Sequence, residues 1–169
     1  MIDIKRKLKN FGPLEFLVLS SLSYIVIMLI WTASTRSSVL QKANDIKYNH
    51  KTIVEFINNE VNKCSSNENS LTSWGENCNS TWNSSNIVKY ILDNFKLNNP
   101  YNINKPLIQT SQDPRIQAEG KAGQSTDKGI IFVSENNFDA EAGSEWIIGT
   151  CIKSPCVAAG NNELVSVYR

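Results

Sequence analysis

The stretch KRKLKNFGPLEFLVLSSLSYIVIMLIW, residues 5–31, decides how the rest of the chain is organised. It opens with four cations, carries one carboxylate at Glu15, and leads into twenty residues, Phe16 to Thr35, without a charged side chain. Twenty helical residues that rise about 1.5 Å each extend about 30 Å, which is the thickness of the hydrocarbon layer of a bilayer. The stretch therefore predicts a membrane-spanning helix, although three serines make it only moderately apolar.

The distribution of charge predicts which side of a membrane each part of the chain occupies. Residues 1–10 carry four cations and one anion, a net charge of +3, whereas the whole chain carries only +1. Basic residues beside a membrane helix are retained in the cytoplasm. We therefore expect a basic leader at 1–10, a transmembrane and assembly helix at 11–35, and an exported globular domain at 36–169. The weak overall charge argues against a nucleic-acid-binding protein, which needs a basic surface.

After the apolar segment the pattern changes to that of an amphipathic helix. Apolar residues and one histidine recur at spacings of three, four and seven, which places them on one helical face. The members of this stripe are Val39, Ala43, Ile46, His50, Ile53, Ile57 and Cys64. No proline or glycine occurs between Pro13 and Gly75, so one helix is expected from Leu14 to Lys63. We interpret His50 as a partly buried core residue rather than a ligand or a base.

Four cysteines, Cys64, Cys78, Cys151 and Cys156, all lie in the part expected to be exported. An even number of cysteines in an exported domain predicts two disulfides. Three pairings are possible, and the local pairs Cys64–Cys78 and Cys151–Cys156 are favoured because each closes a short polar loop. Free buried thiols are the alternative. A zinc site is disfavoured because the Cys151–Cys156 spacing is not that of a zinc knuckle.

The remaining pattern predicts a second helix and a small sheet. The second helix is expected to have Ser85 or Asn86 as its N-cap and to end before Pro100. An edge strand is expected at 103–109 and a loop at 110–128, and three strands joined by polar connectors follow at 129–134, 145–153 and 163–168. Strands connected in this way form an antiparallel meander. The fold class is therefore α+β, with the long N-terminal helix packed on a small antiparallel β-sheet.

The sequence contains none of the common catalytic patterns. It has no GxSxG, HExxH, Walker or dinucleotide-binding motif, and its single histidine excludes a cluster of several histidine ligands. The acidic residues of 139–145 do not have the spacing of a calcium loop, so a solvated connector is the better interpretation. We therefore expect no enzymatic activity, no cofactor, no metal and no nucleic-acid site.

The residues from Lys5 to Glu15, followed by the apolar helix, resemble the N-terminus of type IV pilins and pseudopilins. Precursors of that family have a short basic leader, a cleavage point, a new N-terminal phenylalanine and a glutamate four residues later. Phe11 and Glu15 have this separation here. Two positions depart from the family pattern: Asn10 stands where the family has glycine, and Pro13 falls in the first turn of the helix.

The resemblance implies a pilin-like fold and a structural function. The leader would be removed between Asn10 and Phe11 by a prepilin peptidase, and Phe11 and Glu15 would be the assembly residues. The amine of Phe11 would pair with Glu15 of a neighbouring subunit, so the partners would be copies of the chain or other pilin subunits in a helical filament, handled by a pilus assembly machinery. The C-terminal disulfide loop of pilins would correspond to Cys151–Cys156.

The location implied by the resemblance is the inner membrane, with the C-terminal domain on the periplasmic side, and then an extracellular filament. The chain would be a subunit of that filament, either a major or a minor one. Two alternatives remain open from the sequence. The first is an uncleaved single-pass anchor that carries an exported binding domain. The second is a secreted protein from which residues 1–35 are removed.

Overall fold

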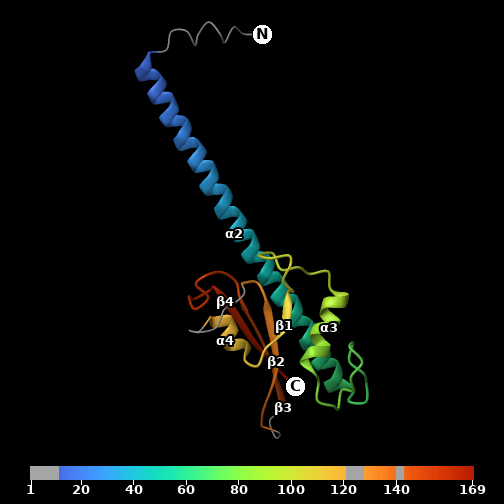
Figure 1. Cartoon of the computed structure of the whole chain (residues 1–169). Helices are drawn as coiled ribbons and strands as arrows, with labels where there is room; N and C mark the ends of the chain where they lie inside the picture. The colour runs from blue at the N-terminus through green and yellow to red at the C-terminus, as the bar shows by residue number, and fades with distance from the viewer. Residues whose placement is uncertain (1–11, 121–127, 140–142) are drawn as a thin grey trace, which may run out of the picture. The chain divides into compact units, whose positions relative to one another are not determined.

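The computed structural model describes residues 12–120, 128–139 and 143–169, and it contains both helices and a sheet (Figure 1). The helices are α2 (Pro13–Ser66), α3 (Ser84–Asn94) and α4 (Pro114–Glu119). The strands are β1 (Ile108–Thr110), β2 (Ile131–Asp139), β3 (Gly143–Cys151) and β4 (Asn162–Tyr168). The chain divides into two compact units, one up to Gln41 and one from Lys42 to Arg169. The α+β class predicted from the sequence is confirmed.

Helix α2 extends slightly beyond both predicted ends. It begins at Pro13, where proline is well tolerated because the first helical residue needs no backbone N–H partner. The first helical hydrogen bond joins the N–H of Phe16 to the carbonyl of Gly12 at 3.1 Å. The helix continues without interruption to Ser66 because no proline or glycine breaks it.

The core of the second unit is built on the amphipathic part of α2. Every predicted stripe residue from Ala43 onward is buried, whereas Val39 is 48% exposed. The stripe shares one apolar cluster with Ile91 of α3 and with Trp146 and Ile148 of β3. Burial of such side chains stabilises a fold by about 1.5–3 kcal/mol each. The prediction that this stripe forms the helix's core face is confirmed from Ala43 to Cys64.

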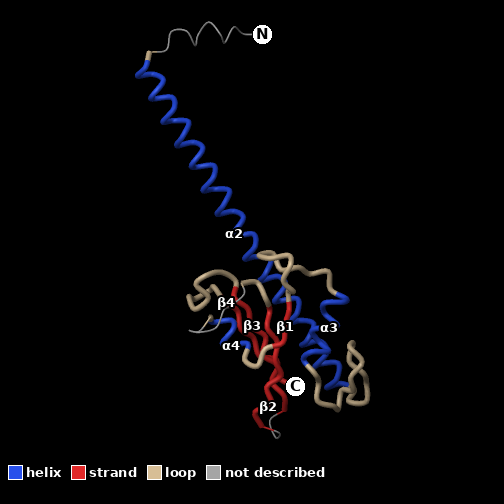
Figure 2. Tube along the Cα trace, viewed as in Figure 1, coloured by secondary structure: helices blue, strands red, loops and turns tan. Residues whose placement is uncertain are grey.

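The sheet is mixed rather than antiparallel, which corrects one prediction. The four strands lie together in one sheet (Figure 2) in the order β1-β2-β3-β4. The meander from β2 to β4 is antiparallel as expected. Strand β1, however, pairs with β2 in parallel, with Gln109 opposite Phe132. A parallel pair needs a crossover between its strands. The segment after Thr110, which contains α4, provides that crossover.

Helix α4 lies in the segment that the sequence predicted to be a loop. Asp113 Oδ1 accepts a hydrogen bond from the N–H of Arg115 at 2.9 Å, Pro114 occupies the first turn, and Gly120 ends the helix with φ of 62°. The helix packs on the sheet at Gly149, where an added Cβ would lie 2.6 Å from the carbonyl oxygen of Pro114. Glycine at this position therefore permits the close approach of α4.

The strand ends also differ from the predicted ones. β1 begins only at Ile108, because Pro106 cannot donate to a sheet and the residues before it form a turn. β2 continues to Asp139, and β3 begins at Gly143, so most of the expected connector at 135–144 is strand. Polar composition suggested a connector there, and strand pairing overrides that local preference.

Candidate membrane and assembly helix

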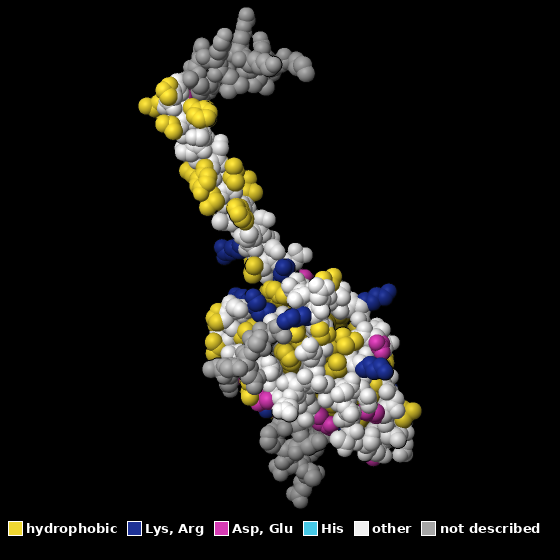
Figure 3. Space-filling view, in the orientation of Figure 1, with side chains coloured by type: hydrophobic (Ala, Val, Ile, Leu, Met, Phe, Trp, Pro, Cys, Tyr) yellow, Lys and Arg dark blue, Asp and Glu magenta, His cyan; other side chains and the backbone are white. Residues whose placement is uncertain are grey.

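The segment of α2 from Leu14 to Trp31 exposes many apolar side chains, which form patches on the surface of the helix (Figure 3). The large apolar side chains from Leu14 to Trp31 are between 42% and 74% exposed. The most apolar window of eighteen residues has a mean hydropathy of 2.1, and none of it is buried within the protein. Among the residues that the structure describes, one helix, near the N-terminus, is long and apolar enough to cross a membrane.

The three serines of this segment bond to the backbone of their own helix. Ser20 Oγ donates to the carbonyl of Leu17 at 2.9 Å. Ser21 and Ser23 do the same toward carbonyls three and four residues earlier, at 2.8 Å each. A hydroxyl that finds its partner inside the helix avoids most of the penalty for an unsatisfied donor in an apolar medium. The serines are therefore compatible with a surrounding of lipid or of other apolar helices.

Glu15 lies in the first turn of α2. Its Oε2 accepts a hydrogen bond from the backbone N–H of Gly12 at 3.1 Å. This contact satisfies one of the N-terminal donors that a helix leaves without an internal partner. A negative charge at this end is also favourable because the helix dipole is positive there. The proposed cleavage and assembly residues Asn10 and Phe11 lie outside the described residues, as does the basic leader.

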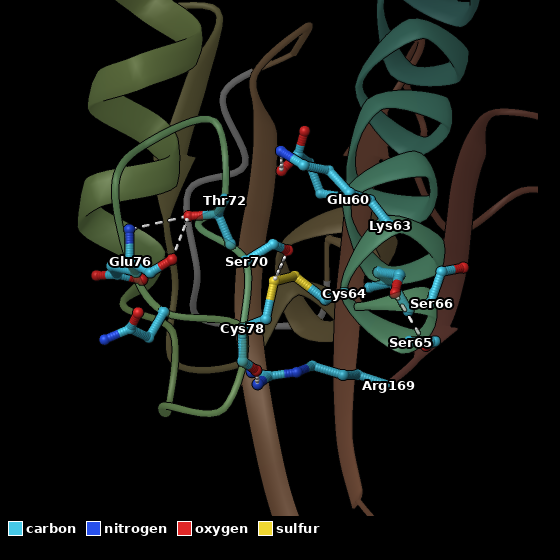
Figure 4. The surroundings of a disulfide bond; sticks show 12 residues. Glu60, Lys63, Cys64, Ser65, Ser66, Ser70, Thr72, Glu76, Cys78 and Arg169 are labelled. Carbon is cyan, nitrogen blue, oxygen red and sulfur yellow. Dashed lines mark hydrogen bonds and ion pairs between the residues drawn. A yellow bond between two sulfur atoms is a disulfide. The ribbon is translucent and has the colours of Figure 1, made fainter. Parts of the chain in front are cut away.

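The end of α2 is joined to the following polar loop by the Cys64–Cys78 disulfide (Figure 4). The Cα atoms of this pair are 5.1 Å apart. Glu60 fixes the same loop a second time, since its carboxylate accepts hydrogen bonds from the N–H and the hydroxyl of Ser73, at 2.8 and 2.5 Å. The loop is thus attached to the helix on two successive turns.

Arg169 is a third attachment of that loop, and no sequence pattern predicted it. Its guanidinium donates to the carbonyl oxygens of Ser80, at 2.9 Å, and of Cys78, and it lies 4.1 Å from the centre of the Trp82 ring (Figure 4). Burial lowers the pKa of Arg169, but a guanidinium remains charged at any physiological pH. A polar cavity of about 450 Å³ lies beside these residues and the disulfide.

The second disulfide, Cys151–Cys156, closes a short loop between β3 and β4, with its Cα atoms 5.3 Å apart. The side-chain amides of Asn161 and Asn162 donate to the carbonyls of Pro155 and Cys156, at 2.8 and 2.5 Å. Both disulfides of the structure are the local pairs favoured from the sequence. The two bonds belong to the covalent frame of the second unit.

Within residues 12–120, 128–139 and 143–169, no group of three or more His, Cys, Asp or Glu side chains is placed to hold a metal ion. Part of the acidic 139–145 segment lies outside these ranges. The chain matches no family model, no curated protein and no solved structure. The chemistry of the helix itself therefore carries the functional proposal.

Proposed function

We propose that the chain is a structural subunit of a type IV pilus or a related pseudopilus filament, and that it assembles through its N-terminal apolar helix. One observation carries this proposal. A single helix combines an exposed, uncharged segment, headed by one carboxylate, with a buried stripe that belongs to a disulfide-bonded α+β domain. A simple membrane anchor needs no acidic group at the start of its apolar helix, whereas a filament subunit has a use for one.

The use of the carboxylate follows from electrostatics. Removal of the leader frees the amine of Phe11, and this cation pairs with Glu15 of the neighbouring subunit. In a low-dielectric bundle of apolar helices each of these charges offsets the desolvation of the other. The present partner of Glu15 is one neutral N–H, that of Gly12, so pairing with an amine adds a charged contact.

The assembly that results is an open one. Before assembly the subunit lies in the inner membrane with its domain on the periplasmic side. On assembly its apolar helix leaves the lipid and packs against the helices of other subunits. The contact joins the start of one helix to a different point on the next, so it repeats without closing and generates a helical filament. Cleavage between Asn10 and Phe11 by a prepilin peptidase precedes this step.

The mature N-terminus, determined by mass spectrometry of the protein from its native host, tests the proposal. A chain that starts at Phe11 supports the filament subunit. An intact Met1 supports the uncleaved anchor with an exported binding domain, and a start near Arg36 supports secretion. The variant Asn10→Gly restores the family's residue before the cleavage point, and we expect it to be processed at least as fast as the native chain.

A second test addresses the pairing. Glu15→Ala is expected to reduce incorporation into filaments at least about tenfold, the effect of losing about 1.4 kcal/mol, because the neighbour's amine is left buried and unpaired. Glu55→Ala removes an exposed carboxylate from the same helix and is the matched control. Normal incorporation of the Glu15→Ala variant, with its exported domain folded, would contradict the proposal.

A further inference from the structure

His50 connects α2 to two strands through its two ring nitrogens. It is the chain's single histidine and is only 2% exposed. Its Nε2 lies 3.2 Å from the carbonyl oxygen of Ile148 in β3. Its Nδ1 lies 3.1 Å from Oε2 of Glu163 in β4. One side chain of the helix therefore meets the centre and the edge of the sheet.

Both partners of His50 are hydrogen-bond acceptors, and this determines how many protons the arrangement requires. A neutral imidazole carries one N–H, so it can donate either to the Ile148 carbonyl or to Glu163, but not to both. If the proton is on Nε2, the lone pair of Nδ1 faces the carboxylate of Glu163. Both contacts are hydrogen bonds only when an additional proton lies between Nδ1 of His50 and Oε2 of Glu163.

The surrounding groups provide Glu163 with another partner when that proton is absent. Lys47 Nζ is 3.9 Å from Oε1 of Glu163, and the Glu163 side chain is 33% exposed. Lys51 lines the same groove but pairs with Glu55 at 3.6 Å. On the β3 side the nearby polar side chain is Thr150, a neutral hydroxyl that donates to the Ile130 carbonyl at 2.8 Å.

A groove of about 360 Å³ gives the proton a path to solvent and gives the carboxylate room to move. It is lined by His50 and Glu163, by the two lysines, and by Tyr48, Val54 and Val165. We propose that His50 and Glu163 form a proton-operated latch between α2 and β4, in which Glu163 is held on His50 when the shared proton is bound and turns to Lys47 when it leaves.

The proton-bound contact between His50 and Glu163 forms at a pH below the ordinary pKa of histidine. Burial lowers the pKa of His50 from its ordinary value of 6.5, and the contacts with Ile148 and Glu163 oppose this shift only in part. A lowered folded-state pKa means that His50 contributes stability above the unfolded-state pKa and loses it as the pH falls through the folded-state value. Acid therefore closes the local contact while it weakens the fold as a whole, so the two effects must be measured separately.

The experiment follows the imidazole and the strand in the full chain in detergent micelles. With ¹⁵N-labelled histidine, the single His50 gives one pair of ring signals. We expect both ring nitrogens to be protonated at the acidic end. The hydrogen-exchange protection of the β4 amides near Glu163, corrected for intrinsic rates, should rise as the pH falls. The midpoint of this rise should equal the midpoint of the His50 titration.

Glu163→Gln separates the latch from simple burial. The glutamine side chain can donate from its NH2 group to Nδ1 of neutral His50 and can accept through its oxygen from Nδ1 of the protonated ring, so β4 protection should no longer depend on pH. The proton affinity of His50 should fall at least about tenfold. Glu55→Gln removes an equal charge from the exposed face of α2 and should leave the titration unchanged.

Three results would overturn the latch. The first two are a His50 titration midpoint that is unchanged in Glu163→Gln, and a midpoint that shifts equally in Glu55→Gln. The third is hydrogen-exchange protection of β4 that does not change with the protonation of His50. If Glu163→Gln does not fold, Lys47→Gln decides the matter. It removes the partner of the open state, so β4 should remain protected to higher pH than in the native chain.

Discussion

The two parts of α2, before and after the boundary between Gln41 and Lys42, satisfy their polar groups in opposite ways. In the first part, hydroxyls such as that of Ser20 bond to the carbonyl of a residue one turn earlier. In the second part, buried polar groups find partners on distant elements: Asn49 donates to the carbonyl of Asn98, and His50 meets β3 and β4. A helix segment whose polar side chains bond to its own backbone can move from one apolar surrounding to another. A segment whose polar side chains bond to other elements is tied to one fold.

The largest difference is expected for loss of an isoleucine side chain. Ile53→Ala removes a fully buried side chain from the second part and should reduce the free energy of unfolding by about 2–5 kcal/mol. Ile25→Ala makes the same change in the first part, where the residue is 55% exposed, and should alter it by less than about 0.5 kcal/mol. Denaturant unfolding of the full chain, followed by near-UV circular dichroism, measures both. An equal loss of unfolding free energy in the two variants would show that the two parts of α2 do not differ in this way.

An introduced charge should have the larger effect in the first part of α2, where it disfavours membrane insertion. Leu22→Arg places a cation in the middle of the apolar segment and should disfavour membrane insertion by about 2.5–3.5 kcal/mol. Tyr48→Arg introduces the same group at a residue of the second part that is 66% exposed, and insertion should not change. Carbonate extraction of membranes gives the integrated fraction of each variant. Full integration of Leu22→Arg would exclude a membrane-spanning role for this segment.

Loss of the first disulfide should affect the second part alone. The double substitution Cys64→Ser with Cys78→Ser opens a loop with a sequence separation of 14, and stability should fall by about 3 kcal/mol. The same change at Cys151 and Cys156, with a separation of 5, should remove about 2 kcal/mol because the loop is shorter. Thermal unfolding ranks the two variants, and the membrane-integrated fraction of both should equal that of the native chain.

The smallest effect concerns acid. A hydrogen bond from Ser166, and then the contact with Arg115 of α4, hold the pKa of Glu145 below its ordinary value of 4.5. A lowered carboxyl pKa adds stability above the unfolded-state value and loses it as the pH falls through the folded-state value. Glu145→Gln should reduce stability by about 1 kcal/mol at pH 7 and flatten its decline below pH 4.5. If stability declines below pH 4.5 as steeply in Glu145→Gln as in the native chain, other carboxyl groups cause the decline.

The features that the sequence predicts well are those encoded by nearby residues. The course of α2 follows from the absence of helix breakers and from the spacing that continues from Ala43 to Cys64. The three strands of the meander follow from apolar runs separated by turn residues. Each of these signals is read within one element, so tertiary contacts are not needed to find it.

The features that the sequence did not predict depend on contacts between distant elements. The start signals of α4, Asp113 and Pro114, are present, but a helix of six residues is too short for a periodic pattern. The parallel pairing of β1 depends on the crossover that follows it. The contacts of His50 with Glu163 and of Arg169 with Cys78 join residues far apart in sequence, and no local pattern indicates such pairs.

The strand order has a consequence for how copies of the chain behave at high concentration. In the described part of the chain the sheet ends at β4, whose seven residues offer backbone groups along one side, whereas the opposite edge, β1, has only three residues. Long open edges recruit strands from other molecules and start aggregation, and a charged side chain on the edge opposes this. Glu163 supplies that charge near the start of β4. The carboxylate that meets His50 is therefore also a charge of the kind that opposes edge-to-edge pairing between copies of the chain.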